Sequence, residues 1–166
     1  LDAAAQIPSA EAKKIAMAAA GAPSTLAVFN ALVRVLIGPV ADKTGTKKIF
    51  VILFVLQIGA MLLLFPAGAS AVFLAAVAAV IGWNYGAMFT LFPATTLQYF
   101  GAIAQGSNYG LLFTSWGIAG FCGPYAGGQL RSLTGSFFVP FALAAVILVV
   151  AVIILVTLKP PQKKHV

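Results

Sequence analysis

The segment IAMAAAGAPSTLAVFNALVRVLIGPVA, residues Ile15–Ala41, is a continuous apolar stretch that contains a single charged residue, Arg34. A helix that crosses a membrane needs about 20 mostly apolar residues, so this segment is long enough. An arginine at such depth costs about 2.5–3.5 kcal/mol and usually faces a cavity or a partner. The polar end of the segment, Asp42, is roughly 12 Å away at the helical rise, so the side chain can snorkel only part of that distance. We therefore expect Arg34 to hold an anion within the membrane.

The composition around this segment is that of an all-α membrane protein. Hydrophobic residues make up 61% of the chain and charged residues 8%, against about 25% charged in a soluble domain. No Lys, Arg, Asp, Glu or His occurs between Ile49 and Leu130, a stretch long enough for three crossings. The net charge of +7 is confined to loops and the tail, which argues against nucleic-acid binding. The lone cysteine, Cys122, excludes an internal disulfide.

The apolar pattern predicts about five transmembrane helices, and turn residues separate them. The predicted spans are 10–41, 49–65, 71–96, 108–130 and 137–158. Residues 1–9 are then an extracytoplasmic loop and 159–166 a cytoplasmic tail. The chain opens on Leu1 in a polar run without a signal peptide, so we expect it to be part of a longer protein.

Basic residues predict the orientation. One group follows the first span and another follows the fifth: Lys43, Lys47, Lys48 and Lys159, Lys163, Lys164. Four crossings separate the two groups, so they share a side, which the positive-inside rule makes cytoplasmic. Lys13, Lys14 and Arg131 lie on the opposite side. We therefore expect a multi-pass protein of the cell (inner) membrane with a cytoplasmic C-terminus.

Five glycines punctuate the fourth predicted span. They are Gly117, Gly120, Gly123, Gly127 and Gly128. Small residues let membrane helices approach closely, so we expect helix contacts on this segment.

The turn after the first span carries a recognisable spacing of glycine, acid and base. In GPVADKTGTKK, residues 38–48, Asp42 follows Gly38 by four residues, and Gly45 follows Asp42 by three. Basic residues complete the pattern at Lys43, Lys47 and Lys48. Gly38 allows a close helix approach, Gly45 suits a left-handed turn, and Asp42 could cap the next helix. We expect the motif as a whole to act as a gating loop. An ordinary inter-helix loop is the alternative interpretation.

This pattern resembles the cytoplasmic-loop signature of the major facilitator superfamily. Four crossings follow it, so the resemblance implies helices 8 to 12 of a twelve-helix carrier, with the N-terminal helical half and the seventh helix absent. GPYAGG, residues 123–128, is similar to the superfamily's fifth-helix motif, here on the eleventh helix, although Ala119 replaces the leading glycine.

A narrower resemblance points to the oxalate/formate antiporter family, which includes bacterial monocarboxylate (lactate-type) permeases. It rests on Phe29-Asn30 with Arg34 and Gly38, on LFPAT at 91–95, and on Asn108-Tyr109-Gly110. In that family an arginine on the eighth helix binds the substrate carboxylate, and Arg34 falls on that position.

Two departures from the family pattern bear on the substrate. Oxalate-transporting members have a lysine on the eleventh helix, where this chain has Trp116. A second carboxylate would then be buried without a partner, which is costly and favours a monocarboxylate. Animal relatives place an aspartate linked to proton coupling where this chain has Asn30, and an amide cannot carry a proton.

The predicted substrate site combines these residues with aromatic pairs on two later spans. Asn30 and Arg34 are i and i+4, on one helix face, and Arg34 would bind a carboxylate bidentately. Tyr85 and Phe89 on the third span, with Phe113 and Trp116 on the fourth, could form an apolar box. Core packing or contact with lipid is the alternative for all four aromatic residues.

The sequence thus predicts a secondary active transporter that moves a lactate- or pyruvate-type monocarboxylate by alternating access, with protons as a further partner. The alternatives are an oxalate/formate-type anion exchanger, a non-transporting membrane sensor or scaffold, and an anion channel. An enzyme is not expected, because the spans hold no catalytic dyad, metal-ligand cluster or phosphate loop and the one histidine, His165, lies in the tail. No cofactor is expected.

Overall fold

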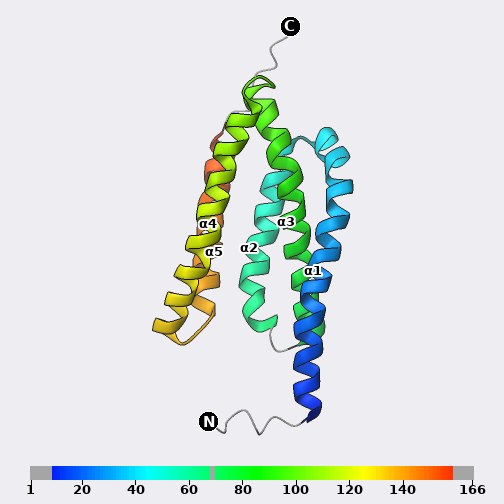
Figure 1. The fold of residues 1–166 in the computed structure, drawn as a ribbon, viewed down its shortest axis with the longest axis vertical. Helices are drawn as coiled ribbons and strands as arrows, with labels where there is room; N and C mark the ends of the chain where they lie inside the picture. Colours follow the sequence, from blue (N-terminus) through cyan, green and yellow to red (C-terminus); the bar gives the residue numbers. More distant parts are fainter. Residues whose placement is uncertain (1–8, 68–69, 159–166) are drawn as a thin grey trace.

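The computed structural model describes residues 9–67 and 70–158, and the regular elements in these ranges are all α-helices (Figure 1). They are α1 (Ser9–Thr44), α2 (Thr46–Ala67), α3 (Ala71–Phe100), α4 (Gln105–Thr134) and α5 (Phe138–Thr157). The prediction of an all-α bundle is confirmed. Residues 1–8 of the predicted loop 1–9 and the tail at 159–166, with its three lysines and His165, lie outside the described residues, and Ser9 is the first residue of α1.

Successive helices run in opposite directions along the long axis of the bundle (Figure 1). The junction between α1 and α2 therefore lies at the same end as the last turn of α5. Four segments are long and apolar enough to cross a membrane: Ala20–Thr44, Thr46–Leu64, Ala71–Phe100 and Phe138–Thr157. The glycine-rich α4 is not one of the four, so its crossing stays a prediction.

The connection between α1 and α2 is much shorter than the seven-residue turn expected at 42–48. The helix continues to Thr44, and α2 begins at Thr46. Only Gly45 breaks the pattern, with a positive φ of 91° that glycine adopts without a Cβ penalty. Asp42 consequently lies within the last turn of α1, so the prediction that it caps α2 is wrong.

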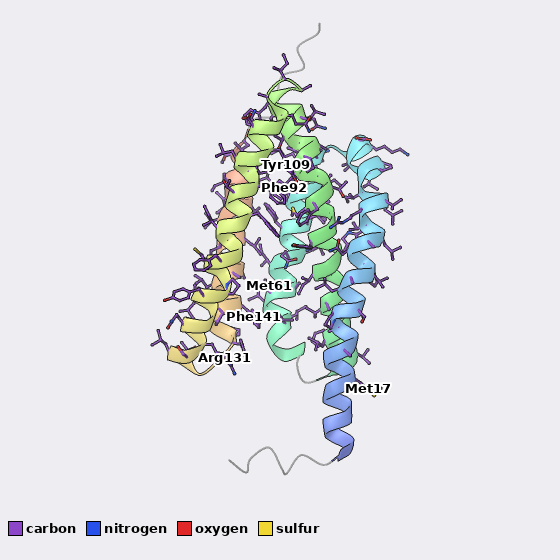
Figure 2. The ribbon with its side chains drawn as sticks, in the orientation of Figure 1. Met17, Met61, Phe92, Tyr109, Arg131 and Phe141 are labelled. Atoms are coloured by element: carbon purple, nitrogen blue, oxygen red, sulfur yellow. The ribbon has the colours of Figure 1, made fainter. Side chains whose placement is uncertain are left out.

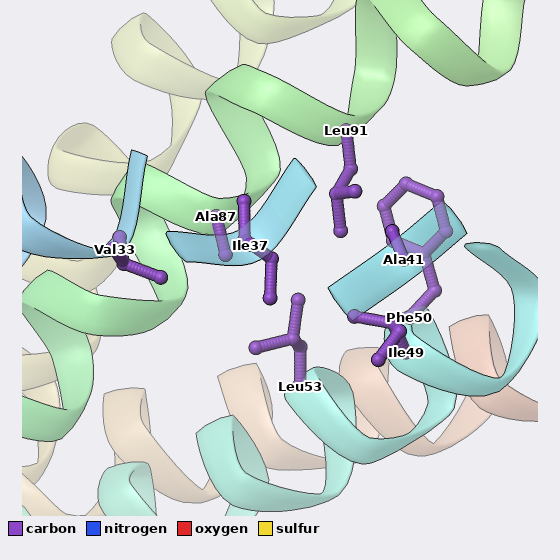
Figure 3. Close-up of a cluster of buried hydrophobic side chains, with 8 residues drawn as sticks. All are labelled: Val33, Ile37, Ala41, Ile49, Phe50, Leu53, Ala87 and Leu91. Carbon is purple, nitrogen blue, oxygen red and sulfur yellow. The ribbon is translucent and has the colours of Figure 1, made fainter. Parts of the chain in front are cut away.

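The main hydrophobic core joins the first three helices, and two of its members, Ala41 and Ile49, flank this turn (Figure 3). Its buried members come from α1 (Val33, Ile37, Ala41), α2 (Ile49, Phe50, Leu53) and α3 (Ala87, Leu91). Lipid tails are as apolar as these side chains, so the hydrophobic effect does not drive helices together within a membrane. Close packing of this kind holds them together instead. This core fixes the part of α1 that carries Arg34 against α3.

Helices α1 and α3 approach most closely at two glycines one turn apart, Gly82 and Gly86. A Cβ atom built on Gly82 would overlap the backbone of Leu26, and one built on Gly86 would overlap the backbone oxygen of Asn30. The spacing is the small-xxx-small pattern that allows membrane helices to touch backbone to backbone. The sequence analysis did not single out these two glycines.

The glycines of α4 behave differently from what was expected. Within the described residues, a Cβ atom on four of the five would meet nothing within 4 Å, and one on Gly127 would lie 3.9 Å from Pro140 Cβ. The helix has no buried residue and packs only lightly on α3 and α5. The expected close contacts of these glycines are therefore absent from the described part of the chain.

Candidate anion-binding site

Arg34 is an exposed residue of α1 and lies beside the crossing with α3. Its Nε atom donates a hydrogen bond of 3.0 Å to Oδ1 of Asn30, one helical turn earlier. Its Cζ atom lies 5.3 Å from the centroid of the Phe89 ring on α3, in a cation–π arrangement. A side chain from its own helix and one from the neighbouring helix thus fix the guanidinium.

The charge of Arg34 is not neutralised within the part of the chain that the structure describes. Of the three carboxylate residues in the sequence, Asp42 is the one whose side chain the structure describes. It lies two turns further along α1. No ion pair joins it to the guanidinium. The Nη1 and Nη2 groups of Arg34 make no hydrogen bond to any described residue. They are therefore available to an anion.

The predicted aromatic residues gather around Phe89. The ring centroid of Phe89 lies 4.9 Å from that of Tyr85, 6.0 Å from that of Phe113 and 5.7 Å from that of Trp116. Phe113 and Trp116 are 5.2 Å apart, and Tyr109 lies 5.5 Å from Phe113. Edge-to-face pairs of this kind are favourable arrangements of aromatic rings.

A cavity of about 420 Å³ lies between α3 and α4 beside this aromatic cluster. Phe92 and Tyr109, labelled in Figure 2, are on its two sides. Tyr85, Met88, Phe89, Leu112, Phe113, Ser115, Trp116 and Ala119 complete the lining. Arg34 is not a lining residue, and Phe89 connects the cavity with the guanidinium.

The structure therefore brings the six predicted substrate-binding residues into one continuous set of contacts. Asn30 and Arg34 form one end, Phe89 is the centre, and Tyr85, Phe113 and Trp116 surround it. Their role in binding a substrate stays a prediction. Tyr109 belongs to the same cluster and was missed as a site residue, although its position one turn before Phe113 was a usable signal.

The predicted loop motif is split by the fold. Lys47 Nζ donates hydrogen bonds to the backbone oxygens of Val156 and Leu158, so it caps the C-terminal end of α5. Lys43 and Lys48 are exposed. Gly38 lies in open space among the described residues, so the close approach expected there is absent. A gating role for the motif stays a prediction.

A second polar contact was also missed by the sequence analysis. Asn84, only 2% exposed, donates a hydrogen bond of 2.8 Å from Nδ2 to Oε1 of Gln57 on α2. The sequence signal for this contact is that Asn84 and Gln57 are single amide side chains in apolar segments. Membrane helices commonly pair such groups with one another. The contact ties α3 to α2 on the side away from Arg34.

Comparison with known proteins agrees with this architecture. Residues 5–166 match the Major Facilitator Superfamily. Over 106 residues the chain is 28% identical to a protein named "Uncharacterized MFS-type transporter YhjX" from Escherichia coli (strain K12). The alignment covers 64% of this chain and 26% of that protein, so the chain spans about a quarter of the relative's length.

The long apolar helices and the family together indicate a multi-pass membrane protein. The family comprises transporters, which agrees with the expectation that the chain is not an enzyme. Because the match extends over nearly the whole chain, we conclude that this chain belongs to the Major Facilitator Superfamily.

Proposed function

We propose that this chain forms the C-terminal half of a secondary active transporter that carries a small monocarboxylate of the lactate or pyruvate type. The observation that carries the proposal is the state of Arg34. Its guanidinium stands on a membrane helix, is held by Asn30 and Phe89, and has no ion-pair partner among the described residues. Residues of this kind within membranes commonly mark the path of a substrate or ion.

The hydrogen bond to Asn30 determines how a carboxylate would approach. Because Nε is already engaged, the two oxygens of a carboxylate meet Nη1 and Nη2 in an end-on, bidentate arrangement. Phe89 covers the guanidinium on one side and excludes water there. A planar group with two equivalent oxygens fits these donors better than a single point charge.

The surroundings of the site favour one negative charge on the substrate. Trp116 contacts the same Phe89 ring as Arg34, and it occupies the place where the family resemblance implies a lysine in oxalate-transporting members. A second carboxylate would meet aromatic carbon instead of a cation, and burying it unpaired is costly. The phenol of Tyr85 could bond a hydroxyl or oxo group of the substrate.

Transport would proceed by alternating access, with the site between this half and an N-terminal half. Apart from Glu11 at the outer end of the first span, the predicted spans contain no Asp, Glu or His. The coupled proton would therefore travel on the substrate's own carboxyl group or on a residue of the other half. The capping of α5 by Lys47 supports placing the α1–α2 turn and the C-terminus on one side of the inner membrane, the cytoplasmic side.

Uptake into proteoliposomes tests the proposal. The full-length carrier should accumulate labelled lactate when a proton gradient is applied, and Arg34→Ala should lower the initial rate by about a hundredfold through loss of the bidentate contact. Arg131→Ala is the matched control, because Arg131 also lies over an aromatic ring, that of Phe137, at 4.2 Å, but at the end of α4. It should retain uptake.

The alternatives give different results in the same vesicles. Oxalate-for-formate counterflow without net lactate uptake would identify an anion exchanger. Lactate binding without flux would identify a sensor or scaffold, and flux that does not saturate would identify a channel. Lactate uptake that survives Arg34→Ala would reject the site.

A further inference from the structure

The contact between α1 and α3 and the proposed site share one atom, Oδ1 of Asn30. A Cβ atom built on Gly86 would lie 2.9 Å from Oδ1 of Asn30 and 2.5 Å from Cγ1 of Val33, and would overlap the Asn30 backbone oxygen. The same Oδ1 atom accepts the hydrogen bond from Arg34 Nε. The absence of a side chain at residue 86 therefore leaves the space in which the Asn30 carboxamide lies.

Gly86 also fixes the second support of the guanidinium. Phe89 follows Gly86 by three residues, so both lie on the face of α3 turned toward α1. The close approach at Gly86 brings α1 near enough for Arg34 Cζ to lie 5.3 Å from the Phe89 ring. A wider spacing of the two helices would lengthen this contact and move Asn30 away from α3.

We propose that Gly86 is a positioning residue for the substrate ligand Arg34, and that it acts through the carboxamide of Asn30. This inference rests on the proposed function and extends it to a residue that would not touch the substrate. Substitution at Gly86 displaces Asn30 and so breaks its hydrogen bond to Nε of Arg34. The Arg34 guanidinium can then rotate away from the pose in which Nη1 and Nη2 meet the carboxylate end-on.

The neighbouring glycine supplies a matched control. Gly82 lies in the same crossing, and the three atoms nearest to a Cβ atom there would be backbone atoms of Leu26, with Cα and C at 2.8 Å and O closer. Gly82→Ala therefore disturbs the helix contact without entering the carboxamide. Gly59→Ala is a second control, because a Cβ atom on Gly59 of α2 meets nothing within 4 Å.

The experiment measures the dissociation constant of lactate by calorimetry on the purified full-length carrier, together with KM and kcat for uptake. Gly86→Ala should weaken binding about tenfold and raise KM in parallel, since a hydrogen bond to a charged group is lost. Gly82→Ala should lower the melting temperature to a similar degree, yet weaken lactate binding clearly less than Gly86→Ala does, because it acts only through the spacing of the two helices. Gly59→Ala should change neither.

Asn30→Ala provides a test that does not depend on the folding of a clashing variant, because it only removes atoms. It should weaken lactate binding about tenfold, and adding Gly86→Ala should then weaken it by less than Gly86→Ala does alone, because the carboxamide is already absent. Three results would each overturn the inference while Arg34→Ala still abolishes binding. They are equal losses of lactate binding in Gly82→Ala and Gly86→Ala, unchanged binding in Asn30→Ala, and additive losses in the double variant. Unchanged binding in Arg34→Ala would instead reject the proposed function.

Discussion

Replacing Trp116 with lysine is predicted to extend the substrate range to a dianion such as oxalate. The distances of 5.3 Å from Arg34 Cζ to the Phe89 ring and 5.7 Å from there to the Trp116 ring place the new charge within about 11 Å of Arg34. At an effective dielectric constant of about 20, an ammonium about 4 Å from a second carboxylate gains about 4 kcal/mol. Repulsion between the two cations, about 1.5 kcal/mol, acts in the free and the bound carrier alike, so it lowers stability and not oxalate affinity. Because the ammonium also loses hydration, the gain corresponds to at most roughly 1,000-fold tighter oxalate binding.

Counterflow in proteoliposomes measures this change. The Trp116→Lys carrier should exchange labelled oxalate, while the wild type should not, and the ratio of oxalate to lactate rates should fall as the salt concentration rises. Phe121→Lys is the control, because Phe121 lies on the same helix and is 77% exposed. Oxalate exchange that is equally strong in both variants would show that general positive charge, and not the placement opposite Arg34, selects the dianion. A folded Trp116→Lys carrier without oxalate exchange would contradict the proposed geometry.

Two further substitutions test the packing that supports the site. Asn84→Ala should destabilise the bundle by about 1 kcal/mol, since it removes the hydrogen bond to Gln57 that joins α3 to α2. Thermal melting in detergent measures this loss. A double variant with Gln57→Ala should show a less than additive loss of stability. Lys47→Met should speed hydrogen exchange in the last turn of α5, because it removes a charged cap worth about 1–2 kcal/mol. Lys48→Met, which alters an exposed lysine, should leave that exchange unchanged.

The helices were predictable because the bilayer imposes a simple requirement on the backbone. In lipid, each backbone polar group must be satisfied within its own segment, so long apolar stretches form helices. The boundary between α1 and α2 was predicted less well. Apolar character falls away at Asp42, but the helix continues to Thr44, because hydrogen bonding along the backbone does not depend on hydropathy and the positive φ that ends the helix comes at Gly45.

The contacts of the candidate site were predictable only within one helix. The i, i+4 spacing was enough to predict that Asn30 and Arg34 share a face, and they are hydrogen-bonded. The same rule placed Tyr85 beside Phe89. The prediction of which glycines lie in close helix contacts was less successful. Glycine-rich α4 makes few contacts, whereas Gly82 and Gly86 lie where α3 approaches α1 most closely. Composition cannot tell which helix faces which neighbour.

The sequence by itself determined that this chain is a membrane bundle of α-helices with one arginine at an apolar depth, because the hydrophobic effect and the backbone's need for hydrogen bonds act on local stretches. Only the tertiary structure decided that Phe89 covers Arg34, that Trp116 contacts Phe89, and that Lys47 caps another helix. Those contacts join residues far apart in the chain. The contact of Arg34 with Phe89 depends on how closely α1 and α3 approach, which the missing side chains of Gly82 and Gly86 permit.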